Sequence, residues 1–535
     1  MQFSPFLRPL IRITLPALLL SAFSLSAAEK KPNIVLLFAD DLGRYASAYA
    51  EAKNPSPNDI LQTPTFDQIA REGALASNAF VSVPSCTPSR AALISGRHFF
   101  RNGSCSQLHH HWHGPDDSDP WQHVQGYARI LEKHGYLIGL THKDHVKGKK
   151  FGPQFNKAGH RANNFSQFVS KDPDIERAKN VVYEETRANF RQFLAQRQDG
   201  QPFLYHFHPT NTHRKWVRGS GKKLWNLDPD QLKGKMPPFL PDVPAIREDF
   251  ADYLGETMAF DHCCAVIVDE LKKLGELDNT LVVISGDHGV PGFPRAKTNC
   301  YDFGSRVLFA ARWPAQIKAG QKIQKPISLI DLAPTFLAAA GLPPEEGSNG
   351  QNLLPALKNG DHQNLRGWAL IGREVHVLAA RDKNLPYPSR AIRTPDFLYI
   401  INFKPERNPS GDLFTLASNK KPERDALTND TYVTYPDIDA SPTKAWMVLH
   451  RDDEKIQKQW ALGFGFRPSE ELYDLKNDPH QINNLADNHR FQDQRSALKK
   501  RLMAELRANE DPRLLGDQFD YPPYCKEGLP LPNKN

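Results

Sequence analysis

Apolar runs that are typical of buried strands alternate with segments of helical spacing over the first three quarters of the chain. The strand-like runs are Asn33–Phe38, Tyr136–Leu140, Phe203–Phe207, Leu281–Ser285 and Val307–Ala311. The segments with helical spacing are Pro64–Glu72, Arg90–Ile94, Tyr127–His134, Phe250–Leu274 and Ile330–Ala340. Continuous apolar strands that alternate with helices are typical of a mainly parallel sheet covered on both faces. The pattern therefore predicts an α/β sandwich around a mainly parallel sheet.

The pattern changes near residue 393. Short strand-like runs follow, with one late helix, at Phe397–Phe403, Trp446–His450, Glu471–Leu475 and Arg490–Ala508. This change predicts a catalytic domain over residues 29–392 and a smaller C-terminal subdomain with an antiparallel sheet over residues 393–535. We expect the two to join near Pro386–Pro395.

The first 28 residues have the features of a secretory signal peptide. Arg8 and Arg12 precede the apolar run Ile13–Phe23, and small residues follow at Ser26–Ala28. The alternative, a membrane anchor, is disfavoured because the run is short and contains a proline. We expect an exported protein without a stable membrane anchor: periplasmic or secreted, or lysosomal if the host is eukaryotic.

Composition narrows the function classes. The chain has 535 residues, 39% of them hydrophobic and 24% charged, a net charge of +7 and a mean hydropathy of −0.56. These values are those of a globular protein and exclude several membrane spans. No dense basic run with interleaved aromatic residues indicates nucleic-acid binding. Six cysteines are too few for a disulfide-stapled scaffold of this length.

Polar residues gather immediately after four of the predicted strands. They are Asp40 and Asp41, His142 to His145, His208 to His213, and Asp287 and His288. Ligand sites of open α/β sheets lie beyond the carboxyl ends of the strands, so these groups should meet at one edge. Carboxylates from two strands supply the oxygen ligands that calcium or magnesium prefers, whereas one Asp-Asp pair alone is more often a turn or helix cap. A zinc site is less favoured because the histidines lack HExxH spacing.

The segment Val83–Gly96 holds an unusual cysteine. Cys86 stands two residues before Pro88, at the predicted start of a helix, where backbone N–H groups favour anions. A buried structural cysteine is the ordinary interpretation of a single cysteine. The combination Cys86-Thr-Pro-Ser-Arg90 followed by Ala-Ala-Leu-Ile-Ser-Gly96 is much more specific.

That segment resembles the signature of type I, formylglycine-dependent sulfatases, in which a maturation enzyme oxidises the cysteine to Cα-formylglycine. Further matching motifs follow the family's order along nearly the whole chain: Asp40-Asp41-x-Gly43, Lys143-x-His145, His213, Asp287-His288-Gly289, Lys297, Ile330–Thr335 and Glu471–Pro479 with Asn484-Leu485. The stretch Ile284–Asn299 resembles the sulfamidase-like branch, the N-sulfoglucosamine sulfohydrolase relatives. One position departs from the family: His288 stands where most sulfatases have asparagine, and imidazole is a poorer calcium ligand than an amide oxygen.

The resemblance implies an alkaline-phosphatase-like core and one calcium ion. The implied metal ligands are Asp40, Asp41, residue 86, Asp287 and His288. One hydroxyl of hydrated formylglycine would attack sulfur, and the second would lose its proton to expel sulfate. Arg90, Lys143 and Lys297 would stabilise the negative charge, His145 would act as base, and His213 with Lys297 would assist the leaving group.

The implied function is hydrolysis of sulfate from sulfated carbohydrates, such as glycosaminoglycan or other polysaccharide fragments. Alternatives are a sulfamidase acting on N-sulfoglucosamine and a phosphodiesterase or phosphonate hydrolase on the same scaffold. The set of Cys86, Arg90, Lys143 and His145 argues against a non-catalytic glycan binder. The tract His109–His113 is interpreted as a polar loop near the pocket rim rather than a metal site.

Overall fold

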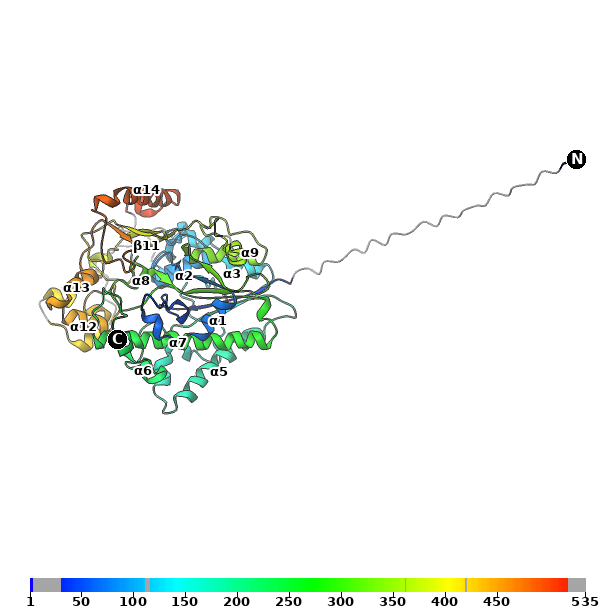
Figure 1. Cartoon of the computed structure of the whole chain (residues 1–535), viewed down its shortest axis with the longest axis horizontal. Coiled ribbons are helices and arrows are strands. Elements are labelled where there is room, and N and C mark those ends of the chain that lie inside the picture. Colours follow the sequence, from blue (N-terminus) through cyan, green and yellow to red (C-terminus); the bar gives the residue numbers. More distant parts are fainter. Residues whose placement is uncertain (3–29, 111–115, 361, 419–420, 518–535) are drawn as a thin grey trace.

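A seven-stranded sheet forms the centre of the molecule (Figure 1). The computed structural model describes residues 1–2, 30–110, 116–360, 362–418 and 421–517, so residues 3–28 of the predicted signal peptide lie outside the described residues. In spatial order the strands are β4 (Leu137–His142), β5 (Phe203–His208), β1 (Asn33–Ala39), β6 (Thr280–Gly286), β8 (Phe309–Arg312), β2 (Ala74–Ala76) and β9 (Gln321–Ile323). The first four of these are mutually parallel, and β8 is antiparallel to β6 and β2. The predicted mainly parallel sheet is confirmed.

Strand β1 is buried along its whole length because helices cover both faces of the sheet. Val35 and Leu37 face one apolar core with helices α1 (Pro64–Glu72), α5 (Ile175–Leu194) and α7 (Pro244–Lys273). Ile34 and Leu36 face a second core with α2 (Cys86–Ser95), α3 (Tyr127–Lys133) and α9 (Leu332–Ala339). Figure 1 shows these two helical layers on opposite sides of the sheet, with α7 running along its length.

The predicted strand Val307–Ala311 is divided in the structure. Residues Arg306–Val307 form β7, which belongs to a small three-stranded sheet with β3 (Ala79–Phe80) and β10 (Ile327–Ser328). Only the following residues, Phe309–Arg312, join the large sheet as β8.

A separate antiparallel sheet, sheet C, has four strands: β11 (Ala369–Arg373), β12 (Ser389–Arg393), β13 (Phe397–Asn402) and β14 (Glu470–Asp474). Helix α14 (Gln492–Ala508) packs on one face of sheet C through Leu502 and Leu506. The other face packs on the main body around Tyr301. The predicted domain boundary at residue 393 falls at the end of β12, inside this sheet.

The predicted strand at Trp446–His450 is wrong, because residues Pro442–Leu449 form helix α12. Ser441 caps the helix by accepting a hydrogen bond from the Lys444 N–H, and Pro442 occupies the first helical turn. A short apolar run cannot by itself distinguish a strand from a buried helix. In this segment, the cap at Ser441 and the proline Pro442 favour the helix over the strand.

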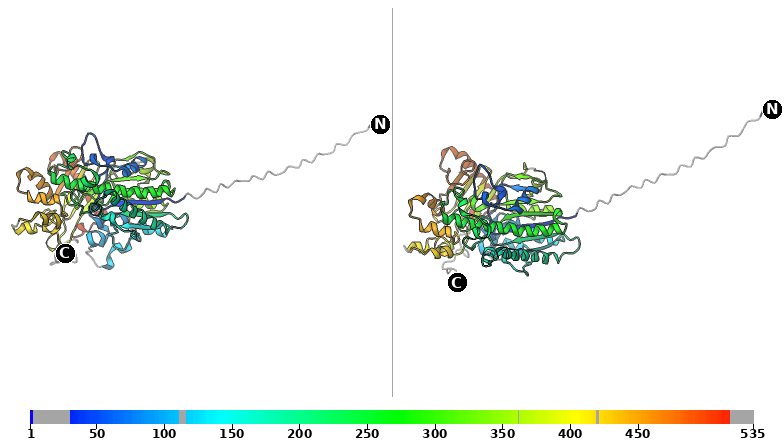
Figure 2. Two further views of the ribbon diagram at one scale, coloured as in Figure 1. Left: turned by 90° about the horizontal axis from the view of Figure 1, so that it is seen from below. Right: turned by 60° about the horizontal axis from the view of Figure 1, so that its bottom comes forward.

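Helices α12 and α13 (Gln457–Phe464) contribute to the same apolar core as α7. Figure 2 shows these orange and yellow helices together at one end of the molecule in both views. The chain after sheet C's third strand thus returns to the main body. Among the described residues, no helix combines the length and the apolar character that crossing a bilayer requires.

Candidate active site

Four acidic and imidazole groups meet where β1 and β6 end. Asp40 and Asp41 directly follow β1, and Asp287 and His288 directly follow its parallel neighbour β6. The backbone N–H of Asp41 donates a 2.8 Å hydrogen bond to Oδ1 of Asp287, which ties the two strand ends together. Asp41 has a positive φ of 56°, and its carbonyl accepts a hydrogen bond from the Tyr253 hydroxyl at 3.1 Å. The parallel pairing therefore brings both acidic motifs to one point, as the sequence predicted.

Cys86 opens helix α2 and points into this cluster. Its Sγ lies 3.3 Å from Nε2 of His288 and 3.8 Å from Oδ1 of Asp41, and the residue is 2% exposed. Ser85 precedes the helix in an extended conformation, and Gly96 ends it with a left-handed φ of 65°. Since a left-handed residue is needed there, glycine fits this position at the least cost.

Arg90 lies one helical turn after Cys86 and connects both strand ends. Its Nε donates to Oδ2 of Asp287 at 2.8 Å, and its Nη2 donates to Oδ1 of Asp40 at 3.3 Å. The side chain is fully buried, and its Nη1 lies 3.3 Å from Nδ1 of His208, at the end of β5. Arg90 thus holds the helix terminus and two carboxylates in one fixed arrangement.

Two lysines complete the charged cluster. Lys143, just after β4, donates to both carboxylate oxygens of Asp40 at 2.7 and 2.6 Å. Lys297 donates to Oδ2 of Asp41 at 2.9 Å and also lies 3.3 Å from Oδ2 of Asp439. The site is therefore a network in which each of these lysines serves a different aspartate of the Asp40–Asp41 pair.

Burial and the neighbouring charges set the protonation states of the cluster. Burial opposes ionisation of Asp40, but Lys143 and Arg90 outweigh it and hold the pKa of its carboxyl well below the usual range. Burial likewise disfavours charged Lys297, but Asp41 and Asp439 raise its pKa well above the ordinary value. Burial, followed by Asp40, raises the pKa of the Cys86 thiol well above its usual value. An unmodified Cys86 is therefore a protonated thiol at neutral pH, and a thiol is a poor nucleophile.

The three predicted histidines occupy different environments. His288 is buried, and its Nδ1 lies 3.1 Å from the Gly289 carbonyl, so that Nε2 faces Oδ1 of Asp41 at 3.0 Å. His213 is the most open, with a side chain that is 37% exposed and an Nε2 that lies 3.9 Å from Oδ2 of Asp41. Burial, with Lys143 next, lowers the pKa of His145 to about 2, so its ring is neutral at physiological pH and only weakly basic.

The donor set fits a divalent cation. One ligand atom from each of Asp40, Asp41, Cys86 and His288 can be chosen so that all four lie within 4.8 Å of one another. Within the described ranges, this is the one group of three or more such side chains that could hold a metal ion. Asp287 lies beside the group, 3.6 Å from Nε2 of His288, and its carboxylate already accepts from Asp41 and Arg90.

The formal charge of the cluster also favours a cation. Its carboxylates are Asp40, Asp41, Asp287 and Asp439, and its cations are Arg90, Lys143 and Lys297. Leaving histidines aside, four negative and three positive side chains leave one negative charge, which would repel an anionic substrate. A divalent cation reverses the sign to one positive charge, which would attract a substrate of single negative charge.

All six residues predicted to be catalytic belong to this neighbourhood, but sequence reasoning missed several of their partners. Asp439, which contacts Lys297, lies in an irregular segment about 140 positions later in the chain and follows no predicted strand. His376, whose Nδ1 is 2.9 Å from the Ser85 hydroxyl, follows β11 and likewise carried no local signal. His208 was visible in the sequence as the residue directly after a predicted strand, but its contact with Arg90 was not foreseen.

The predicted histidine tract is only partly described. The ring of His109 lies 5.8 Å from that of His145, centroid to centroid, which places this residue next to the site. Nδ1 of His110 is 3.5 Å from Sγ of Cys105. His111 to His113 lie outside the described residues.

Comparison with known proteins agrees with this geometry. The family model described as Sulfatase matches residues 32–342, more than half of the chain. The protein belongs to the sulfatase family. It is 29% identical over 490 residues to human N-sulphoglucosamine sulphohydrolase, covering 86% of each chain. It is 24% identical to an ulvan-active sulfatase of Formosa agariphila, covering 92% of this chain and 76% of the relative.

Solved structures show that this sulfatase has the alkaline-phosphatase-like fold. One neighbour, solved in complex with its substrate D-glucosamine-2-N,6-O-disulfate, has a TM-score of 0.59 and 18% identity and covers 90% of this chain and 99% of its own. The phosphonate monoester hydrolase of Agrobacterium radiobacter has a TM-score of 0.57 and 16% identity and covers 89% of this chain and 95% of its own. At these identities the likeness concerns the fold alone.

Proposed function

We propose that this sulfatase hydrolyses sulfate groups from sulfated carbohydrates, using an oxidised Cys86 and one bound divalent cation, calcium. The observation that carries the proposal is the convergence of Cys86, two strand-end carboxylate groups and three fixed cations around one point. The relatives named for sulfated sugars and for ulvan support a carbohydrate substrate.

Oxidation of Cys86 to formylglycine explains why a buried, protonated thiol stands at the centre of the site. The aldehyde, once hydrated, offers a hydroxyl nucleophile at the position of Sγ, next to Asp41 and His288. A formylglycine-generating maturation enzyme is therefore an expected partner. Export through the predicted signal peptide, to the periplasm or cell exterior, completes this proposal.

Asp40, Asp41, residue 86 and His288 would hold the cation, with Asp287 beside them. When bound, calcium supplies positive charge that polarises the sulfate oxygens. Arg90 and Lys143 fix Asp40 in its ionised form and orient it for this role. Lys297 places a positive charge beside Oδ2 of Asp41.

Two histidines, His213 and His145, are candidates for the two proton transfers of the reaction. His213 is the candidate acid for the leaving group, because its Nε2 faces the cluster while much of its side chain is open to solvent. Neutral His145 is the candidate base, and its Nδ1 bonds no other described residue, so it is free to accept a proton. A bound anionic sulfate will raise the pKa of His145 and strengthen it as a base.

Two related activities remain alternatives. A sulfamidase is favoured by the likeness to N-sulphoglucosamine sulphohydrolase, and it needs the same acid to protonate nitrogen in place of oxygen. A phosphodiesterase or phosphonate hydrolase is suggested by a shared fold. A two-metal phosphodiesterase would require a second carboxylate–histidine cluster, and the described residues hold one group of this kind.

A substrate screen of the matured protein tests the proposal. Sulfate release is measured from defined O-sulfated oligosaccharides and from N-sulfoglucosamine, with a phosphate diester and a phosphonate monoester as competing substrates. We expect sulfate release to exceed phosphate or phosphonate turnover. Faster turnover of the phosphorus substrates would replace the proposal with a phosphoryl hydrolase, and release from N-sulfoglucosamine alone would make the protein a sulfamidase.

A further inference from the structure

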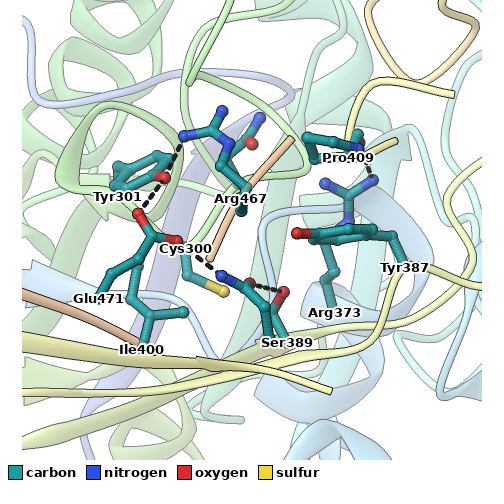
Figure 3. A pocket seen from close by; sticks show the side chains of 11 residues that line it. Cys300, Tyr301, Arg373, Tyr387, Ser389, Ile400, Pro409, Arg467 and Glu471 are labelled. Atoms are coloured by element: carbon teal, nitrogen blue, oxygen red, sulfur yellow. Dashed lines mark hydrogen bonds between the residues drawn. The ribbon is translucent and has the colours of Figure 1, made fainter. Parts of the chain in front are cut away.

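A second buried polar site lies between sheet C and the segment that follows Lys297. It is a small cavity, about 10 Å³, and Figure 3 shows the side chains around it. We call it the arginine cavity, defined by Cys300, Tyr301, Arg373, Tyr387, Arg467 and Glu471. All six residues are buried. A space of this size holds about one water molecule or one monatomic ion.

Several strong hydrogen-bond donors at the cavity have no partner among the described residues. Arg467 donates through Nη1 to the Tyr301 hydroxyl, but its Nε and Nη2 are unpaired. Arg373 donates through Nη2 to the Pro409 carbonyl at 2.9 Å, but its Nε is unpaired. The hydroxyl of Tyr387 is unpaired as well. Each unpaired buried donor lowers the stability of the folded protein by about 1–3 kcal/mol. Several such donors at one place therefore indicate that an acceptor is missing.

Glu471, the carboxylate that lines the cavity, does not supply that acceptor. Glu471 is already bonded by neutral donors: the hydroxyls of Tyr301 and Tyr473, at 2.6 and 2.5 Å, and Nδ2 of Asn402, at 2.7 Å. Its negative charge is therefore held away from an ion pair with Arg467.

The charge around the cavity is positive. Oδ2 of Asp437 lies 2.7 Å from Nη2 of Arg373 and 2.6 Å from Nη2 of Arg381. This group of two arginines and one aspartate therefore carries one positive charge. On the other side, the guanidinium groups of Arg295 and Arg467 lie 3.6 and 4.9 Å from the ring centre of Tyr301. With Glu471 counted as the second acid, the whole cluster of four arginines and two acids has two excess positive charges. Arginine does not lose its proton in proteins, so this excess cannot be removed by titration.

We propose that the arginine cavity binds one monatomic anion of the halide class. A halide ion accepts hydrogen bonds from all sides, which matches unpaired N–H and O–H donors from Arg373, Arg467 and Tyr387. It also offsets part of the buried positive charge, which a water molecule cannot do. A sulfate or phosphate ion is too large for about 10 Å³ of space.

The anion would influence the active site through two chain segments that lie near both the cavity and the active site. Cys300 and Tyr301 follow Lys297 by three and four residues, and the shared Asp437 precedes Asp439 by two. Lys297 lies against Asp439 in the active site. The ion would therefore brace the two segments that position this lysine, without touching the substrate.

Thermal unfolding of the full-length matured protein in two salts tests the proposal. Chloride is compared with gluconate, a large organic anion, at the same pH and ionic strength. We expect chloride to raise the Tm by about 1–3 °C with saturation, as binding to the native state alone requires. Crystals soaked in bromide should show an anomalous peak between Arg467 and Tyr387.

Tyr387→Phe is the sharpest variant, because the lost hydroxyl bonds no described residue and its removal breaks no internal hydrogen bond. Its Tm in gluconate should equal that of the wild type within about 1 °C, while at least half of the chloride-dependent rise is lost. Arg218→Gln, which removes an exposed arginine paired with Glu248, should keep the full rise. Three results would show that the cavity holds water only. They are a wild-type Tm that is the same in both salts, a chloride-dependent rise in Tyr387→Phe as large as that of the wild type, and a bromide map without a peak.

Discussion

The active site and the arginine cavity are both buried clusters of charged side chains, and they differ in which sign is in excess. The active site has four carboxylates against three cations, whereas the cavity has four arginines against two carboxylates. A third cluster, formed by Glu374, Arg390, Asp511 and Arg513, is balanced. Since an uncompensated charge inside a protein is costly, the first imbalance predicts a bound cation and the second a bound anion, while the third needs neither.

The largest expected effect comes from removing Asp40. Asp40→Ala takes away a proposed cation ligand, the carboxylate that pairs with Lys143 and one of the two carboxylates that pair with Arg90. We expect it to abolish measurable sulfatase activity and to lower stability by about 3–5 kcal/mol, as breaking a buried ion pair does. Steady-state kinetics and chemical unfolding measure the two effects.

Asp511→Asn is the matched control, because Asp511 is equally buried and bonds Arg390 at 2.6 and 2.8 Å. It should lose stability to a similar extent and keep activity within about threefold. Near wild-type activity in Asp40→Ala, or in the presence of a strong chelator, would contradict the cation assignment.

A smaller, substrate-dependent effect is expected at the mouth of the site. His213→Ala removes the proposed acid, and acid catalysis is typically worth about 10²–10⁴-fold. Because a nitrophenolate departs without a proton, we expect the loss to be large on a sulfated sugar and small on nitrophenyl sulfate. Cys86→Ala should lose both activities equally. Equal losses for the two substrates in His213→Ala would leave this residue as a sulfate-binding group.

Much of the active site could be predicted from the sequence, because its residues lie at strand ends. Apolar runs mark the strands, and the residues directly after them, such as Asp40 and Asp287, must gather at one edge. The arginine cavity has no such signature. Arg373, Arg467 and Tyr301 are distant in the chain and meet only when sheet C packs on the main body. Asp439 was missed for the same reason, and Trp446–His450 was misassigned because a short apolar run fits both helix and strand.

The next smaller effect concerns the ligand that departs from the family pattern. His288→Asn replaces Nε2, 3.0 Å from Asp41, with a side chain that offers the oxygen ligand calcium prefers. We expect calcium affinity to rise by about tenfold, equivalent to about 1.4 kcal/mol. The calcium concentration that gives half of the maximal rise in Tm measures this. A lower affinity in the variant would mean that the imidazole suits the bound metal and that the natural ion is not calcium.

The smallest expected effect is the change in Tm of a few degrees that chloride produces through the arginine cavity. Asp511→Asn should retain this change, because the balanced cluster is not part of the cavity. Loss of the chloride effect in that variant would show that sheet C responds to salt as a whole, and the distinction between the clusters would fail.

Sulfate hydrolysis by this protein should depend on the oxidation of Cys86, and one titration tests this dependence directly. Samples prepared with increasing amounts of maturation enzyme are divided, so that mass spectrometry gives the converted fraction at Cys86 and sulfate release from a sulfated oligosaccharide gives the rate. We expect the rate to be proportional to the converted fraction, with a line through zero. A rate that is unchanged when Cys86 remains a thiol, or full conversion without sulfate release from any sulfated sugar, would contradict it.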